Sequence, residues 1–232
     1  MSIHDGHRQR LRQRFLEEGL DNFKEHEVLE LLLYHCIPRG DTNPLAHRLV
    51  EEFGSFAKVL EASPQELKQV KGVGDGVAAY FALLQEALRY YQVNRVDAGR
   101  PMSTVEACGR YLVPLFLNRR NETVFLLCLD GKCKMLCCRM VGEGSVNSTA
   151  VSVRRIVEMA LEAGATSVVL AHNHPSGIAV PSDEDVATTM RVAMALSAVE
   201  IVRGDHIVVA DDDYVSLRQS GLYRPEACAL PL

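Results

Sequence analysis

The chain has 232 residues, of which 47% are hydrophobic and 24% are charged, and this is the composition of a soluble globular protein with one large or two small domains. Its formal net charge of -5 argues against a protein whose whole surface binds nucleic acid. No apolar run approaches the roughly 18 residues that cross a membrane, and the polar start has no signal-peptide core. We therefore expect a cytoplasmic protein without a membrane segment.

The first third of the chain is predicted to be helical. In the third of its helices, Leu45, Leu49 and Phe53 recur at helical spacing, and Gly54 ends the pattern. A later helix begins with Ser at the cap position, Pro in the first turn and Glu three residues after the Ser. The expected helices span residues 8–19, 24–34, 45–53 and 56–61, with another beginning at Ser63.

A glycine-rich segment, residues 70–77, precedes a further helix expected over 78–91. The order helix, apolar-x-Gly-apolar-Gly, helix resembles a helix-hairpin-helix unit, whose glycines allow a tight turn and whose amide groups face a phosphate. In that family such hairpins contact the DNA backbone without reading sequence. Asp75 would repel an anion, so a purely structural helical pair is the alternative. The candidate DNA contacts are Lys71, Gly72, Gly74 and Gly76.

Polar residues after Tyr91, ending in Gly99 and Pro101, are typical of a linker. We therefore divide the chain into a helical domain over 1–92, a linker over 93–101 and a second domain over 102–226, with a poorly ordered tail after Arg224.

The second domain is predicted to mix strands and helices. Asp130-Gly131 is a two-residue hairpin signal, and Gly142-Glu143-Gly144 is expected to be a loop. The helix over 149–163 has apolar residues at i, i+3, i+4, i+7 and i+8. The other expected helices begin near Ser103 and span 186–198, and the expected strands span 123–129, 132–141, 166–171, 201–202, 206–209 and 214–217.

The cysteines are expected to be free thiols, since the seven are an odd number in a chain without an export signal. Three of them form the pattern C-x-x-x-C-C, which lacks the paired C-x-x-C spacing of a structural zinc site and falls in an expected strand. Packing is therefore favoured over metal binding for Cys133, Cys137 and Cys138.

The most informative stretch follows the strand over 166–171. His172 and His174 are two residues apart, so in extended chain their side chains share a face, and Asp185 falls in the first turn of the next helix. Two imidazoles and a carboxylate suit a catalytic zinc, because they leave one position free for water. An ordinary interpretation also exists: Ser182 is a helix cap with an acidic residue at the third helical position. Ser182 can cap the helix while Asp185 binds metal.

The order His-x-His, seven residues, Ser, two residues, Asp resembles the signature of the JAMM (JAB1/MPN+) metallopeptidases. The surrounding Ala-His-Asn-His-Pro-Ser-Gly and Pro-Ser-x-x-Asp closely resemble the RadC branch, and residues 205–209 and 214–216 resemble that family's closing strands. The resemblance covers nearly the whole chain. It implies an α+β fold, with a JAMM/cytidine-deaminase-like mixed sheet flanked by helices and preceded by a small all-helical domain.

The resemblance also implies a ligand set and catalytic groups. His172, His174 and Asp185 would hold Zn²⁺, and Ser182 would hydrogen-bond the oxyanion. The family's general acid/base is a glutamate before a strand. Glu122, which directly precedes the apolar strand, fits that position better than Glu143 in its Gly-flanked loop or Glu158 on a helix. The Asn173 side chain, between the two imidazoles, should face away from the metal.

The implied function is a zinc-dependent hydrolase of peptide or isopeptide bonds, acting on a protein or peptide substrate that the sequence leaves open. The segment between His174 and Asp185 is short and has no obvious insertion for gripping a ubiquitin-like partner. The alternative is a DNA-associated accessory protein that binds DNA through its helix-hairpin-helix and carries a structural or vestigial metal site. The RadC name suggests DNA repair, but the net charge gives that suggestion no support.

Overall fold

The computed structural model describes residues 3–95, 101–144 and 152–224. Its contacts divide the chain into two compact units, Met1–Leu88 and Arg89–Leu232, each described here by itself. Part of the expected linker and the tail after Arg224 lie outside the described residues. No helix in the described ranges is both long and apolar enough to cross a bilayer.

The first unit is helical, as the sequence predicts. Its helices are α1 (Ile3–Glu18), α2 (Glu25–Cys36), α3 (Asn43–Phe53), α4 (Phe56–Glu61), α5 (Pro64–Leu67) and α6 (Asp75–Asn94), the last of which continues into the second unit. The apolar faces of α2 to α6 enclose one core, which includes Leu29, Leu49 and Phe81. Gly54 ends α3 with φ of 86°, a left-handed conformation that favours glycine.

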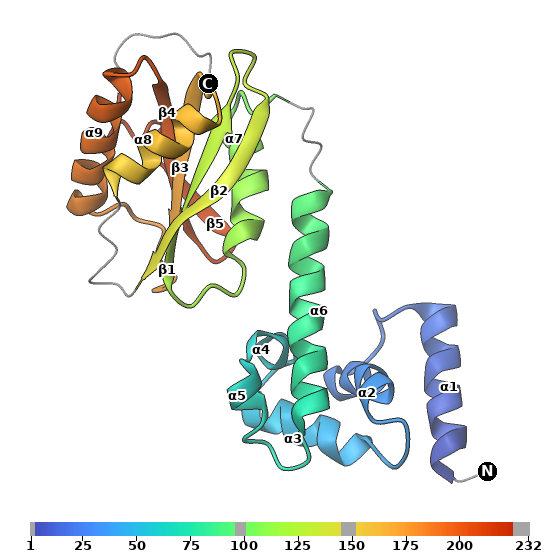
Figure 1. Ribbon diagram of the computed structural model, residues 1–232. Coiled ribbons are helices and arrows are strands. Elements are labelled where there is room, and N and C mark those ends of the chain that lie inside the picture. Colours follow the sequence, from blue (N-terminus) through green and yellow to red (C-terminus); the bar gives the residue numbers. More distant parts are fainter. Residues whose placement is uncertain (1–2, 96–100, 145–151, 225–232) are drawn as a thin grey trace. The chain divides into compact units, whose positions relative to one another are not determined.

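The second unit contains a five-stranded mixed sheet, so the α+β expectation is confirmed (Figure 1). The strand order is β2-β1-β3-β4-β5, and only β3 and β4 run parallel. The elements are α7 (Val105–Leu112), the 3₁₀ helix η1 (Val113–Phe116), β1 (Glu122–Leu129), β2 (Met135–Gly144), α8 (Val153–Glu162), β3 (Ser167–Asn173), α9 (Asp183–Ser197), β4 (Val202–Ala210) and β5 (Asp213–Ser216).

Helices cover both faces of this sheet (Figure 1). Side chains alternate between the faces: Leu126 and Leu170 pack with α8 and α9, whereas Leu127 and Val169 pack with α7. The β3–α9–β4 unit places the end of β3 beside the start of α9. In open sheets of this kind, ligands bind beyond the carboxyl ends of the parallel strands.

Three local predictions for the second unit are wrong. Residues 142–144 are the end of β2, where Gly142 pairs with Val124 of β1, and not a loop. The expected strands 201–202 and 206–209 are one strand, β4, with an irregularity opposite Val168/Val169. The β1–β2 connection is longer than the two residues Asp130-Gly131, because Asp130 N–H donates to the Lys134 carbonyl, 2.9 Å away.

Candidate metal centre

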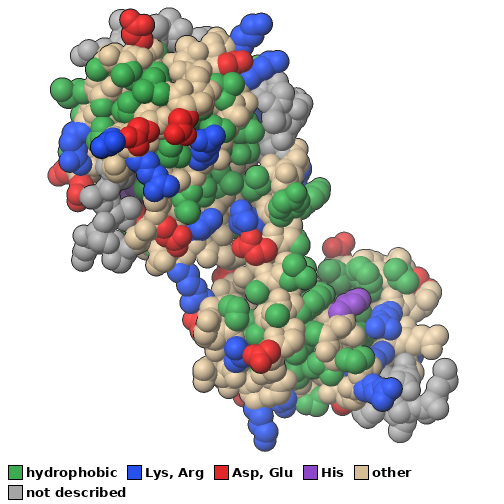
Figure 2. Space-filling model, in the orientation of Figure 1, with side chains coloured by type: hydrophobic (Ala, Val, Ile, Leu, Met, Phe, Trp, Pro, Cys, Tyr) green, Lys and Arg blue, Asp and Glu red, His purple; other side chains and the backbone are tan. Residues whose placement is uncertain are grey.

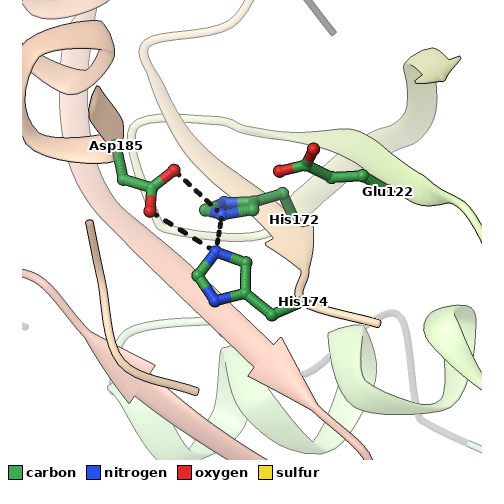
Figure 3. Close-up of side chains that lie close together, drawn as sticks. All are labelled: Glu122, His172, His174 and Asp185. Carbon is green, nitrogen blue, oxygen red and sulfur yellow. Dashed lines mark hydrogen bonds and ion pairs between the residues drawn. The ribbon is translucent and has the colours of Figure 1, made fainter. Parts of the chain in front are cut away.

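Four side chains from three elements converge at the carboxyl end of β3 (Figure 3). Glu122 begins β1, His172 lies near the end of β3, His174 follows that strand, and Asp185 lies in the first turn of α9. One potential ligand atom from each lies within 4.8 Å of all the others. The structure therefore brings together the three predicted metal ligands and one of the three glutamates considered as the base.

The two imidazoles face each other through the same ring atom. The Nε2 atoms of His172 and His174 are 3.0 Å apart. The Asp185 carboxylate lies beside both, with Oδ1 at 3.1 Å from His172 Nε2 and Oδ2 at 3.4 Å from His174 Nε2 (Figure 3). Each of these oxygens or nitrogens offers a lone pair, so the arrangement concentrates electron donors around a small space.

The Nδ1 atoms of both histidines have hydrogen-bond partners within the protein. His174 Nδ1 is 3.0 Å from the Ile178 carbonyl oxygen, which can only accept, so Nδ1 carries the proton and Nε2 keeps its lone pair. His172 Nδ1 is 2.8 Å from Nε2 of the buried His206, whose Nδ1 is 2.6 Å from the Thr189 hydroxyl. Both imidazoles thus turn Nε2 toward the candidate metal position.

In the first turn of α9, Ser182 caps the helix and Asp185 lies in the candidate metal site. Ser182 Oγ accepts from the Asp185 backbone N–H at 3.1 Å, and Asp185 Oδ2 accepts from the Ser182 backbone N–H at 2.7 Å. The Ser182 hydroxyl also donates to Asp185 Oδ2 at 2.6 Å. Ser182 is therefore a helix cap, as expected, and it also holds the carboxylate toward the histidines.

The pKa of Asp185 reflects this surrounding. Burial alone would raise the pKa of this carboxyl, but in the metal-free site hydrogen bonds from His172 and His174, whenever a proton occupies Nε2 of these rings, outweigh burial and hold the pKa well below its usual range. The hydrogen bond with Asp185 in turn raises the pKa of His174. The carboxylate is therefore ionised at neutral pH, as a metal ligand requires.

Of the three glutamates considered as the base, Glu122 lies in the cluster. It is two residues before Val124, which pairs with His172, so Glu122 and His172 share one face of the sheet. Glu143 instead accepts from the Asn121 amide at 3.1 Å and lies 3.5 Å from the Arg119 guanidinium. Glu158, the third glutamate considered, pairs with Arg154 on α8 at 2.7 Å.

Asn173 turns away from the cluster, as expected, but its side chain has a structural task. Its Oδ1 accepts from the buried Thr123 backbone N–H at 2.8 Å. Its Nδ2 lies 3.2 Å from the Asn121 carbonyl oxygen and 3.4 Å from that of Arg119. These contacts lie on both sides of Glu122 in the sequence, so Asn173 fixes the start of β1 against the end of β3.

The sequence interpretation missed His206, Thr189 and the Ile178 carbonyl. Residues 205–209 resemble a closing strand of the RadC family, but that resemblance gave His206 no task. The available signal was His206 itself, the one polar residue of the expected strand over 206–209. Its meaning depends on β4 lying beside β3, which no local pattern reveals.

The glycine-rich segment over 70–77 belongs to the helical unit: residues 70–74 connect α5 to α6, and residues 75–77 begin α6. Val70, Val73 and Val77 are buried in the core of this unit. Gly72 has φ of 102°, and the Lys71 carbonyl accepts from Arg48 Nε at 3.2 Å. Lys68 pairs with Asp75 at 2.9 Å. Gly74 and Gly76, like Lys71 and Gly72, are exposed.

The charge of this unit does not indicate a nucleic-acid surface. Residues 1–88 contain 10 Lys and Arg against 14 Asp and Glu. On the face shown in Figure 2, acidic and basic side chains are interspersed. The helix-hairpin-helix assignment and DNA binding by these residues therefore stay predictions.

The cysteines that the structure describes are all free thiols. Cys133 lies in the β1–β2 connection with φ of 58°, outside the strand expected for it, whereas Cys137 and Cys138 lie in β2. Cys128 and Cys137 are directly paired across β1 and β2. Burial raises the pKa of Cys128 to about 12, so this thiol stays protonated at neutral pH.

Comparison with known proteins covers both units. Residues 102–222 match the RadC-like JAB domain family, and residues 6–79 match the UPF0758 N-terminal family. A UPF0758 protein of Rhodobacter capsulatus is 36% identical over 212 residues, which cover 91% of this chain and 99% of that protein. A UPF0758 protein of Ruegeria pomeroyi is 34% identical over 215 residues, covering 93% of this chain and 96% of the relative.

The JAB match and the cluster of Glu122, His172, His174 and Asp185 point to a JAMM-type protein with a possible metal site. The resemblance to RadC is thereby confirmed. With both matches spanning its two parts, the chain belongs to the RadC-like JAB family in the arrangement of the UPF0758 proteins.

Proposed function

We propose that this protein is a zinc-dependent hydrolase of peptide or isopeptide bonds. The single observation that carries the proposal is the convergence of His172, His174, Asp185 and Glu122 within 4.8 Å at the end of β3. The two histidines and Asp185 are suitable zinc ligands, and Glu122 supplies a further carboxylate that is free to act as a base. A purely structural zinc site would instead use four protein ligands.

The donor set fits zinc. Two imidazole nitrogens and a carboxylate are a usual catalytic zinc set. The two Nε2 atoms are 3.0 Å apart, and Asp185 oxygens lie 3.1 and 3.4 Å from them, so one ion can contact all three side chains. Without a cation, two Nε2 lone pairs facing each other at 3.0 Å repel unless a proton lies between them. A bound zinc ion would lower the pKa of a coordinated water to about 7 and polarise the scissile carbonyl.

Glu122 would act as the general base and then the general acid. Its carboxylate would accept a proton from the attacking water and deliver it to the nitrogen of the leaving amine. The Asn173 contacts to residues on both sides of Glu122 hold it at the edge of the ligand cluster. Such fixed placement lowers the entropic cost of the proton transfers.

Ser182 would donate a hydrogen bond to the oxyanion that forms on the substrate. In this structure its hydroxyl donates to Asp185 Oδ2 at 2.6 Å, so the proton has to turn toward the substrate for that task. The turn becomes favourable once Asp185 is engaged elsewhere, because the Ser182 backbone N–H still holds the carboxylate at 2.7 Å. Removal of one oxyanion donor costs about 10²–10³-fold in kcat in other enzymes.

The test uses the zinc-loaded chain and a mixture of peptides and ε-lysyl isopeptides, with new amino groups detected by mass spectrometry. The wild-type protein should cleave members of the mixture. Glu122→Gln should keep zinc and lose about 10²–10⁴-fold of the rate, as expected for a general base. Glu143→Gln is the matched control and should cleave like the wild type. Full activity of Glu122→Gln would remove this glutamate from the mechanism.

The same experiment separates catalysis from a merely structural metal. Removing zinc with a chelator should abolish cleavage and leave the sheet folded, because its core is built from apolar residues on both faces. If the second unit melts without zinc and no substrate is cleaved with it, the metal serves the fold and the hydrolase proposal fails.

A further inference from the structure

Behind His172, a second buried histidine occupies the space between the sheet and α9. His206 lies on β4, the strand parallel to β3, and its register partner is Leu170, two residues before His172. His172 and His206 therefore lie on the same face of the sheet, as near neighbours. Thr189, on α9, closes the row from the other side, and His206 and Thr189 are almost fully buried.

The three side chains form one hydrogen-bonded row. His172 Nδ1 is 2.8 Å from His206 Nε2, and His206 Nδ1 is 2.6 Å from Thr189 Oγ1. A neutral imidazole has one N–H donor and one acceptor, so the row has only two possible directions. In one, protons point from His172 toward Thr189; in the other, they point from Thr189 toward His172.

Only one direction is compatible with the proposed metal site. If His206 donated to His172 Nδ1, the single proton of neutral His172 would move to Nε2, which is the atom facing His174 and Asp185. That proton would block the metal. If His172 donates instead, Nε2 keeps its lone pair, His206 Nε2 accepts, and His206 Nδ1 donates to the Thr189 hydroxyl.

We propose that His206 is a positioning residue for the metal site, which accepts the Nδ1–H of His172 and thereby fixes the ring angle and the tautomer that present Nε2 to zinc. This inference rests on the proposed function, since it assumes that zinc binds His172. In this direction Thr189 is the terminal acceptor of the row, and its hydroxyl gives the buried Nδ1–H of His206 a partner.

The two histidine ligands are thus held in different ways. His174 is backed by a carbonyl oxygen, which enforces one tautomer by itself. His172 is backed by an imidazole, which can donate or accept, so its tautomer depends on His206 and Thr189. Partners that orient metal-bound histidines typically change metal affinity by about 10–100-fold when they are removed.

The test measures zinc affinity of the full chain by competition with a chromogenic chelator. His206→Leu removes the acceptor and should weaken zinc binding by about 10–100-fold. His206→Gln restores an acceptor near the former Nε2 position and should bring the affinity back to within about threefold of the wild type. Zinc binding of His206→Leu equal to the wild type, or no recovery in His206→Gln, would overturn the proposal.

Two further measurements keep the test decisive if His206→Leu does not fold. Thr189→Val is nearly isosteric and should weaken zinc binding measurably, whereas unchanged affinity would count against the row. Nitrogen-15 NMR of the zinc-loaded wild type should find the proton of His206 on Nδ1; a proton on Nε2 would contradict the direction of the hydrogen bonds. Absence of zinc from the wild type would instead contradict the proposed function and, with it, this inference.

Discussion

The helical unit and the sheet unit bury polar side chains in different places. Among the described residues of the helical unit, the buried polar side chains are Arg8, Glu30 and Thr42. The sheet unit buries a larger set: Thr123, Ser167, His172, Asn173, Thr188, Thr189, Arg203, Asp205, His206 and Ser216. Burying a polar group costs free energy unless it is hydrogen-bonded. Thr42 Oγ1, Ser167 Oγ and the Arg203 guanidinium have no hydrogen-bond partner among the described residues, and the partners of the other groups show what their burial serves.

In the helical unit, buried polar groups join helices and loops. The Arg8 guanidinium donates to the carbonyls of Pro38 and Gly40, at 3.1 and 2.7 Å. Glu30 accepts from the Asn43 amide at 3.0 Å. These contacts tie α1 to the α2–α3 connection and α2 to the start of α3. The described residues of this unit contain no cluster of metal-binding side chains.

In the sheet unit, much of the buried polar set lies around the carboxyl end of β3. His206 and Thr189 back His172, and Asn173 holds the backbone on both sides of Glu122. In the sheet unit the buried polar groups at the carboxyl end of β3 thus support the candidate site, whereas those of the helical unit tie its elements to one another. Three substitutions test this difference between the two units.

The largest effect is expected in the helical unit. Phe81 is fully buried in the core of this unit. Phe81→Ala should lower the unit's free energy of unfolding by about 3–5 kcal/mol, because a large cavity remains. Leu83→Ala, on the same helix but 66% exposed, should change stability by less than about 0.5 kcal/mol. Hydrogen exchange resolved by peptide measures both. If zinc affinity falls with Phe81→Ala, the two units are not energetically separate.

Asn173→Ala should have an intermediate effect within the sheet unit. It leaves the buried Thr123 N–H without its acceptor, which costs about 1–3 kcal/mol in thermal unfolding. Zinc should still bind, whereas hydrolysis should fall because Glu122 loses its support. Asn121→Ala, which removes a surface contact to Glu143, is the control. Loss of zinc from the Asn173 variant would mean that its side chain supports the ligands themselves.

The smallest effect concerns the start of α2. The Lys24 backbone N–H donates to Glu27 Oε2 at 2.8 Å, and this bond, helped by Arg14, holds the pKa of Glu27 below its usual value. A lowered pKa stabilises the folded state above the unfolded pKa of about 4.3, and the contribution is lost as the pH falls through the folded value. Glu27→Ala should therefore cost about 1 kcal/mol at pH 7.

At pH 3 the difference between Glu27→Ala and the wild type should shrink, because the wild-type carboxylate is then becoming protonated. Thermal unfolding at both pH values, with Glu17→Ala as the exposed control on α1, measures this difference. A constant difference from pH 7 to pH 3 would show that the charge of Glu27 contributes nothing.

Much of the fold follows from local patterns. The period of apolar residues predicts α3 and α8, and Ser63 and Ser182 mark helix starts through their own hydrogen bonds. The metal ligands were accessible because His172, His174 and Asp185 lie close in sequence, on a strand end and the helix that follows it. A sequence motif predicts such ligands because the local secondary structure fixes how residues close in sequence lie relative to one another.

What the sequence interpretation missed depends on strand pairing over long separations. Residues 142–144 have glycines that favour a loop locally, but pairing with the start of β1 makes them strand. Arg203 and Asp205 interrupt the apolar pattern, although Asp205 is satisfied inside β4 by the Ser216 hydroxyl. The contact between His206 and His172 depends on β4 pairing with β3. Propensity is a weak guide where tertiary pairing decides.

The zinc content of the purified full chain shows whether His172, His174 and Asp185 form a metal site. Elemental analysis should find about one zinc per wild-type chain and little in the double variant His172→Ala/His174→Ala. The matched control is His26→Ala/His47→Ala, which removes a close histidine pair of the helical unit, stacked at 4.0 Å between ring centroids, and it should keep its zinc. No zinc in the wild type after zinc is supplied, or equal zinc in the His172→Ala/His174→Ala protein, would contradict the account.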